Sequence, residues 1–184
     1  MSADQDEALK PLHDCLYEGM AFYQTSENYS AAAVAQQRER TVAGCVNDHA
    51  FHNLREALDG KPGCHFPNIR GLEILNFKDL AVIRIKKVNG AGRWRNARTK
   101  QQIDYDAQLP LTGIPSEAVR LVAGYQPDPA FSGVQRVIIS APLGKTIAWA
   151  AQVVIIDDVA SWTDITPARL PGTARTDFDK RRKG

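Results

Sequence analysis

The residues between Leu80 and Ile103 form the part of the chain best suited to binding phosphate. This stretch contains seven bases and no acid. Its bases, amides and tryptophan are Arg84, Lys86, Lys87, Arg93, Trp94, Arg95, Asn96, Arg98, Lys100, Gln101 and Gln102. Clustered lysines and arginines contact phosphates, arginine and amide side chains read base edges, and an indole stacks on an exposed base. This basic segment (residues 84–102) therefore predicts a binding site for nucleic acid or another polyanion.

Two other interpretations of the basic segment stay open. A surface that docks a partner protein also concentrates charge, and a solvated sheet edge is often basic so that it does not pair with other chains. No aromatic-rich RNA-binding signature or metal finger accompanies the segment. The sequence therefore favours nucleic acid without excluding a protein partner or a solvated face.

The charge of the chain is divided unevenly along its length. The total is only +2, but residues 1–60 carry a net charge of −6, residues 61–103 carry +8, and residues 104–184 are neutral. This division predicts an anionic partner for the middle third, or two oppositely charged parts that attract each other.

Glu73 and Asp79 precede the triplet Arg84-Ile85-Lys86 in an order similar to that of some metal-dependent nucleases. Such enzymes place an acid, and then an acid-x-lysine triplet, on adjacent strands, where carboxylates hold the metal and lysine assists the attacking water. Here Arg84 takes the position of a carboxylate, and a guanidinium does not ligate a cation. A diverged nuclease is therefore a third interpretation, and no catalytic residue is predicted.

The sequence Ala141-Pro-Leu-Gly-Lys-Thr ends like a phosphate-binding loop. The full motif needs a glycine five positions before Gly144, where Ile139 stands, and a helix that starts at Lys145. The residues from Thr146 onward have the pattern of a strand. We therefore expect a hairpin turn here.

Cysteines and histidines gather loosely around the end of the helical third. A zinc site needs four such ligands in a tetrahedron, but their spacing matches no zinc signature and adjacent Cys64 and His65 make an awkward pair. The residues are Cys45, His49, His52, Cys64 and His65. We expect a core cysteine and surface histidines, no metal and no cofactor. No serine or cysteine has a nucleophile elbow around it, and Asp157-Asp158 is expected in a solvated turn, so the sequence favours a non-enzymatic protein.

Two helices are expected in the acidic N-terminal third. The first covers residues 4–24, with Pro11 in or near its first turn because an interior proline costs about 3 kcal/mol. Ser30 is predicted to cap a second helix that reaches Leu58 and ends before a glycine and a proline. The residues at helical spacing are Leu9, Leu12, Leu16 and Met20 in the first helix and Val34, Thr41, Cys45, Phe51, Leu54 and Leu58 in the second.

The chain after residue 70 predicts a sheet. Two strands over residues 72–77 and 80–88 are joined through Lys78-Asp79 as a tight hairpin. In the second strand Arg84 and Lys86 alternate with apolar residues, which indicates a half-buried strand with a basic outer face.

Further elements follow this hairpin. A short helix is expected within residues 96–109, and three more strands over residues 119–126, 134–141 and 146–156. The last strand is long and apolar enough for the centre of the sheet. Trp149 and Trp162 are expected in the core.

These elements predict an α+β fold in which N-terminal helices pack on a mostly antiparallel sheet of about five strands. One domain is expected over residues 1–160, helical over 1–60 and with its sheet over 70–156, followed by an extended, partly disordered tail over 161–184. No apolar run is long enough to cross a membrane, no signal-peptide layout opens the chain, and three irregularly spaced cysteines favour reduced thiols. A cytoplasmic protein without a membrane partner is therefore expected.

Residues 71–149, less than half of the chain, resemble an uncharacterised family of small bacterial proteins. The resembling sequences are Arg84-Ile-Lys-Lys, Arg93-Trp-Arg-Asn with Thr99-Lys-Gln-Gln, Leu109-Pro-Leu-Thr-Gly-Ile-Pro, Leu121-Val-Ala-Gly-Tyr-Gln-Pro-Asp and the strand that holds Trp149. Genes of this family lie beside repressor-type helix-turn-helix regulators and metallopeptidase-like partners in mobile elements and phage-related loci. The resemblance implies a bacterial protein with a role in phage regulation or antiviral defence.

The leading expectation is a non-enzymatic regulatory module that binds nucleic acid, or a DNA-bound protein regulator, through the basic segment. The alternative is a protein-interaction component, such as an antitoxin-like or inhibitor subunit, that docks a partner or a second copy. The sequence does not distinguish DNA from RNA, and it leaves the oligomeric state open.

Overall fold

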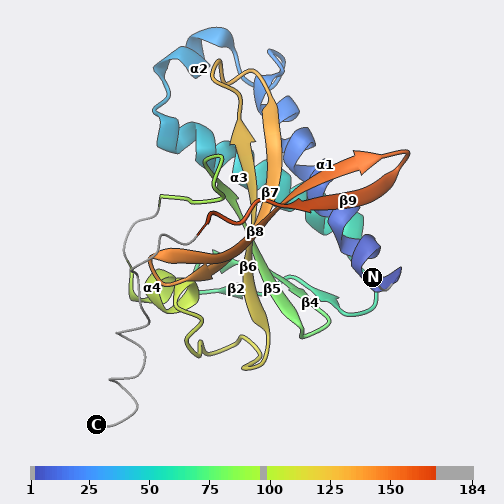
Figure 1. The fold of residues 1–184 in the computed structure, drawn as a ribbon. Helices are drawn as coiled ribbons and strands as arrows, with labels where there is room; N and C mark the ends of the chain where they lie inside the picture. Colours follow the sequence, from blue (N-terminus) through green and yellow to red (C-terminus); the bar gives the residue numbers. More distant parts are fainter. Residues whose placement is uncertain (1–2, 96–98, 169–184) are drawn as a thin grey trace.

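Seven strands form one sheet in which β5 and β6 are parallel and all other neighbours are antiparallel (Figure 1). The order is β1 (Cys64–His65), β4 (Leu75–Phe77), β5 (Ala81–Lys87), β6 (Val119–Pro127), β7 (Val134–Leu143), β8 (Thr146–Ile156) and β9 (Val159–Asp164). A second sheet pairs β2 (Asn68–Ile69) with β3 (Leu72–Glu73). This computed structural model describes residues 3–95 and 99–168, without the side chains of residues 3–7. The α+β class is confirmed, with seven strands in the main sheet instead of about five.

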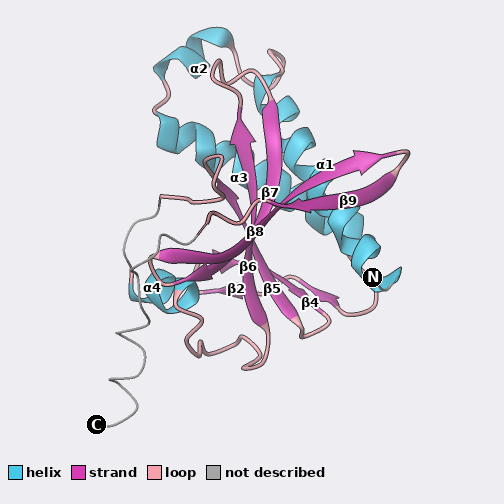
Figure 2. Cartoon of the chain, viewed as in Figure 1, coloured by secondary structure: helices cyan, strands magenta, loops and turns pink. Residues whose placement is uncertain are grey.

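The helices stand in two groups (Figure 2). On one side lie α1 (Ala3–Gln24), α2 (Ala31–Gln36) and α3 (Glu39–Leu58), and on the other lies α4 (Lys100–Asp106). Leu16 of α1 and Leu54 of α3 are fully buried in a core that also includes Ile83 of β5. Each such side chain stabilises the fold by about 1.5–3 kcal/mol through its removal from water. No described helix is both long and apolar enough to cross a membrane.

The N-terminal helices differ from the prediction at two points. Pro11 lies inside α1 and not in its first turn, and the adjacent Leu12 is buried, so core packing offsets the backbone hydrogen bond that proline cannot make. Ser30 caps α2 as expected, because its Oγ accepts a hydrogen bond from the Ala33 amide at 3.2 Å. The predicted second helix is two helices, separated by extended backbone at Gln37 and Arg38.

The β4–β5 hairpin forms as predicted. Lys78 and Asp79 both have positive φ angles, of 54° and 55°. Two consecutive residues in this region make the turn that matches the twist of antiparallel strands. The predicted first strand is interrupted before this hairpin, because residues 72–73 belong to β3 and residues 75–77 to β4.

The parallel pairing of β5 with β6 determines what covers the second face of the sheet. Parallel neighbours need a long crossover, and residues 88–118, which include α4, form it. A second buried core lies beneath this crossover and includes Val82, Tyr105 and Val122. The predicted basic outer face of β5 is therefore wrong: Arg84 and Lys86 share their face with buried Val82, under the crossover.

The last two strands also correct the sequence interpretation. β8 lies next to the edge and not at the centre, because β9 pairs with it and ends the sheet. Trp149 and Trp162 are 40% and 46% exposed, so their expected place in the core is wrong. β9 extends to Asp164, past the domain boundary expected at residue 160, and residues 169–184 lie outside the described part of the chain.

Candidate polyanion-binding site

Three cations point from the sheet toward α4. Arg84 and Lys86 alternate with apolar residues on β5, and Arg120 of β6 pairs in register with Val82 of the same face. Because neighbouring residues across a ladder share a face, Arg120 lies on the α4 side as well. These side chains and the residues of the crossover that contact them form what we term the α4 cluster: Arg84, Lys86, Trp94, Gln102, Tyr105, Asp106 and Arg120.

Hydrogen bonds fix α4 above these cations. The Arg84 guanidinium donates to Oε1 of Gln102 and lies 5.2 Å from the centre of the Tyr105 ring. Gln102 in turn donates from Nε2 to the Asp106 carboxylate at 2.7 Å. The Tyr105 hydroxyl lies 2.8 and 2.7 Å from the carbonyl oxygens of Val82 and Leu121 and shares its one proton between them. One tyrosine therefore links α4 to both parallel strands, and its burial raises the pKa of this phenol far above its ordinary value.

The α4 cluster holds more positive than negative charge. Burial, with a smaller effect of the neighbouring Arg84 charge, lowers the pKa of Lys86 to about 8. Burial also lowers the pKa of the Arg120 guanidinium, which is 2% exposed and whose Nε and Nη2 have no hydrogen-bond partner among the described residues. Against three cations the cluster has one carboxylate, that of Asp106, whose pKa is raised by burial. A buried charge without a partner is costly, so this arrangement favours an added anion.

The loop that leads from β5 to α4 holds two arginines outward. Oδ1 of Asn89 accepts hydrogen bonds from the backbone amides of Ala91 and Arg93, at 3.1 and 3.0 Å. The loop then contacts the sheet, where Oγ of Ser140 donates to the carbonyl of Gly92 at 3.1 Å. Trp94 packs against the second core, and its side chain donates to Asp106, so the flanking Arg93 and Arg95 are exposed.

The other predicted site residues separate into three groups. The Lys100 side chain is 92% exposed at the start of α4, and its Nζ lies 3.9 Å from Oδ2 of Asp104. The neighbouring Gln101 instead points inward, where Nε2 donates to the carbonyl of Ile69 at 2.8 Å. Lys87 lies on the opposite face of β5, where it pairs with Glu39. Asn96 and Arg98 lie outside the described residues.

The structure therefore divides the basic segment by role. Arg84, Trp94 and Gln102 make internal contacts that position α4, while Arg93, Arg95 and Lys100 are exposed around them. Sequence reasoning missed Tyr105, Asp106 and Arg120, because none of them lies within the basic segment. One signal existed for Arg120: it is a lone base within an apolar strand pattern.

The residues considered for a nuclease or a metal site do not gather. Glu73 is exposed on β3 in the small sheet, whereas Asp79 is in the β4–β5 turn and accepts a hydrogen bond from Asn76 at 2.7 Å. His49 contacts the Tyr29 hydroxyl at 3.0 Å, and Cys64 is buried in the core. Within residues 3–95 and 99–168 there is no group of three His, Cys, Asp or Glu side chains that could hold a metal ion.

No protein-family model, curated protein or solved structure matches this chain. The resemblance of residues 71–149 to a phage-associated bacterial family therefore stays a prediction.

Proposed function

We propose that the protein is a non-catalytic module that binds nucleic acid, or a nucleic-acid-bound regulator, through its β5–α4 connection. The observation that carries this proposal is the unbalanced charge of the α4 cluster: Arg84 and Lys86 face the single carboxylate of Asp106, and Arg120 of the same face has guanidinium nitrogens without a hydrogen-bond partner among the described residues. A phosphate group near Lys86 supplies the missing negative charge. The exposed arginines beside Trp94 then contact neighbouring phosphates of the same backbone.

The shape of the connection also supports this proposal. Arg93 and Arg95 follow a loop that is fixed by Asn89 and by Ser140, and they flank an indole that is anchored on Asp106. A cation on a fixed backbone loses less conformational entropy on binding than one on a free chain. Bases that only keep a surface solvated do not require a fixed loop. The anchored loop therefore favours a role for Arg93 and Arg95 in binding a ligand.

The test is a fluorescence-polarisation titration of labelled single-stranded and double-stranded oligonucleotides over a salt series. Several phosphate contacts make the affinity fall steeply with salt, by roughly 0.9 in the log–log slope for each contact to duplex DNA. Arg93→Gln with Arg95→Gln should therefore reduce the slope by about 2. The matched control is Arg136→Gln with Lys145→Gln, which removes two exposed charges from β7 and the β7–β8 turn.

The control variant should retain the slope of the unaltered protein. Absence of binding at low salt would refute the proposal, and so would an equal loss in the two double variants. Because single-stranded and double-stranded probes are compared in the same assay, the preferred form of nucleic acid is read from the same data.

A second candidate function, a protein-interaction component, is favoured by one specific observation. Trp149 and Trp162 are 40% and 46% exposed, on a face that both share with buried Val153. Exposed tryptophans are enriched in protein interfaces because they bury a large apolar area. If this face binds a second copy, light scattering after size exclusion should give the mass of a dimer for the unaltered protein. The Trp162→Thr variant should then have the mass of a monomer. A monomer at all concentrations argues against self-association.

A further inference from the structure

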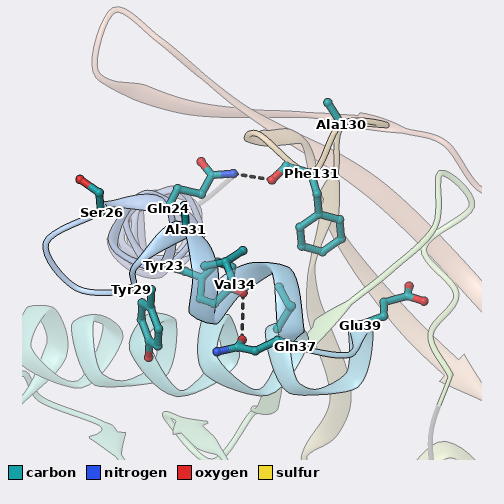
Figure 3. A pocket seen from close by; sticks show the side chains of 11 residues that line it. Tyr23, Gln24, Ser26, Tyr29, Ala31, Val34, Gln37, Glu39, Ala130 and Phe131 are labelled. Carbon is teal, nitrogen blue, oxygen red and sulfur yellow. Dashed lines mark hydrogen bonds between the residues drawn. The ribbon is translucent and has the colours of Figure 1, made fainter.

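A pocket of about 460 Å³ opens between the helical layer and the β6–β7 loop (Figure 3). It is formed by the end of α1, by α2, by the start of α3 and by the loop after β6. The lining side chains are Tyr23, Gln24, Ser26, Tyr29, Ala31, Val34, Gln37, Glu39, Val42, Ala130 and Phe131. This volume suits a small organic molecule.

The walls of the pocket are mainly apolar and aromatic. The rings of Tyr23 and Tyr29 lie 4.9 Å apart, and the ring of Phe131 projects toward α2 from the opposite side (Figure 3). Several polar groups at the margin already bond to one another. The Tyr23 hydroxyl donates to Oε1 of Gln37 at 2.9 Å, and Gln24 donates to the carbonyl of Phe131. The pocket thus offers aromatic faces held in place by their own hydrogen bonds.

The charge of the lining is negative. Glu39 is its one charged residue, with a side chain that is 75% exposed at the edge of the pocket. A carboxylate beside aromatic rings attracts cations, because the faces of the rings are also negative. This carboxylate is already paired with Lys87, and the charge of Arg95 also lowers the pKa of its carboxyl, so a ligand ammonium binds here only in exchange for Lys87.

A lysine of the chain shows that this corner accepts an ammonium group. Nζ of Lys87 lies 4.6 Å from the centre of the Phe131 ring and is also paired with Glu39. The same aromatic face and the same carboxylate therefore already hold a primary ammonium. A ligand with this group has to compete with Lys87 for them.

We propose that this pocket binds a small organic ammonium compound with an aromatic or apolar body. The body lies against Tyr23, Tyr29 and Val34, and the ammonium group takes the corner between Phe131 and Glu39. Binding displaces Lys87 from this corner. No residue of the pocket belongs to the α4 cluster, but Lys87 is part of the basic segment and the charge of Arg95 lowers the pKa of the Glu39 carboxyl, so the two sites are neighbours.

The first experiment uses the unaltered protein and three probes of similar size. Calorimetric titrations compare 2-phenylethylammonium with the neutral 2-phenylethanol and the anionic phenylacetate, each up to about 10 mM, a range suited to weak ligands of this size. The ammonium compound should bind at least about threefold more tightly than the alcohol. Equal affinity for the alcohol, tighter binding of phenylacetate, or no binding of the ammonium compound would overturn the proposal.

The second experiment uses the competition with Lys87. Lys87→Met removes the internal ammonium but keeps the length of the side chain, so affinity for 2-phenylethylammonium should rise by about threefold or more. Glu39→Gln and Phe131→Leu should each weaken it by about threefold. The controls are Lys145→Met and Glu56→Gln, which change the same charges at exposed positions outside the lining and should leave the affinity unchanged. Weaker binding by Lys87→Met contradicts the proposal, because it shows that lysine attracts the ligand.

Discussion

Replacing Lys86 with methionine should stabilise the fold and weaken nucleic-acid binding at the same time. Lys86 lies under the crossover, where burial lowers its pKa from 10.5 to about 8. At pH 7 the side chain is still protonated, so the folded protein bears the cost of a poorly solvated charge. Methionine occupies a similar volume without that charge.

The size of the effect follows from the pKa shift. A shift of one pKa unit corresponds to about 1.4 kcal/mol, so a change from 10.5 to about 8 gives an upper limit of about 3 kcal/mol. Because Lys86 is only partly buried, water screens part of this cost. We expect Lys86→Met to raise the free energy of unfolding at pH 7 by about 1–3 kcal/mol.

The pH dependence of stability gives an independent check. Between about pH 8 and pH 10.5 the unfolded chain keeps the Lys86 proton while the folded chain has lost it. The unfolded state then binds more protons, so the contribution of Lys86 to stability rises with pH over this range. The advantage of Lys86→Met over the unaltered protein should therefore be largest at pH 7 and should shrink as the pH approaches 10.

Urea denaturation at a series of pH values measures the stability, and the polarisation titration measures the affinity. Lys145→Met is the control, because it removes an exposed charge from the β7–β8 turn and should leave the stability within about 0.5 kcal/mol. A loss of stability in Lys86→Met would refute the reasoning on burial. Unchanged affinity for nucleic acid would show that Lys86 does not meet phosphate.

Two other substitutions test how the crossover is attached to the sheet. A Cβ on Gly124 would lie 2.4 Å from Cγ1 of Val88, so Gly124→Ala should cost about 2 kcal/mol or more in urea denaturation. Gly44→Ala is its control: apart from its chain neighbours and the backbone of its own helix, no atom of the described residues lies within 4 Å of the added Cβ, and the exchange within α3 should stabilise the protein by about 0.5–1 kcal/mol. Tyr105→Phe removes the hydroxyl that bonds β5 and β6, and should cost about 1–3 kcal/mol; a change below about 0.5 kcal/mol would mean that this hydroxyl does not hold α4 on the sheet.

Local patterns in the sequence were sufficient to predict most elements. The cap at Ser30 and the turn at Lys78-Asp79 depend on residues within four positions of each other. The alternation of Arg84 and Lys86 with apolar residues showed that they share one face of β5, because side chains alternate along any strand. Most of the helices and longer strands, and the concentration of bases in residues 84–102, could therefore be predicted from the sequence alone, whereas the break between α2 and α3 and the strand β9 were not.

Only the tertiary structure decided what that face of β5 meets. The sequence pattern of a strand is the same whether its neighbour is parallel or antiparallel, so the β5–β6 pairing and the crossover above it could not be predicted. That pairing brings Arg120 to the α4 side and seats Tyr105 and Asp106 near Arg84. Because of the β5–β6 pairing, the residues predicted to form a basic outer face belong instead to a partly buried cluster with excess positive charge. Long-range strand pairing, and not local sequence, sets burial, and burial sets the cost of each charge.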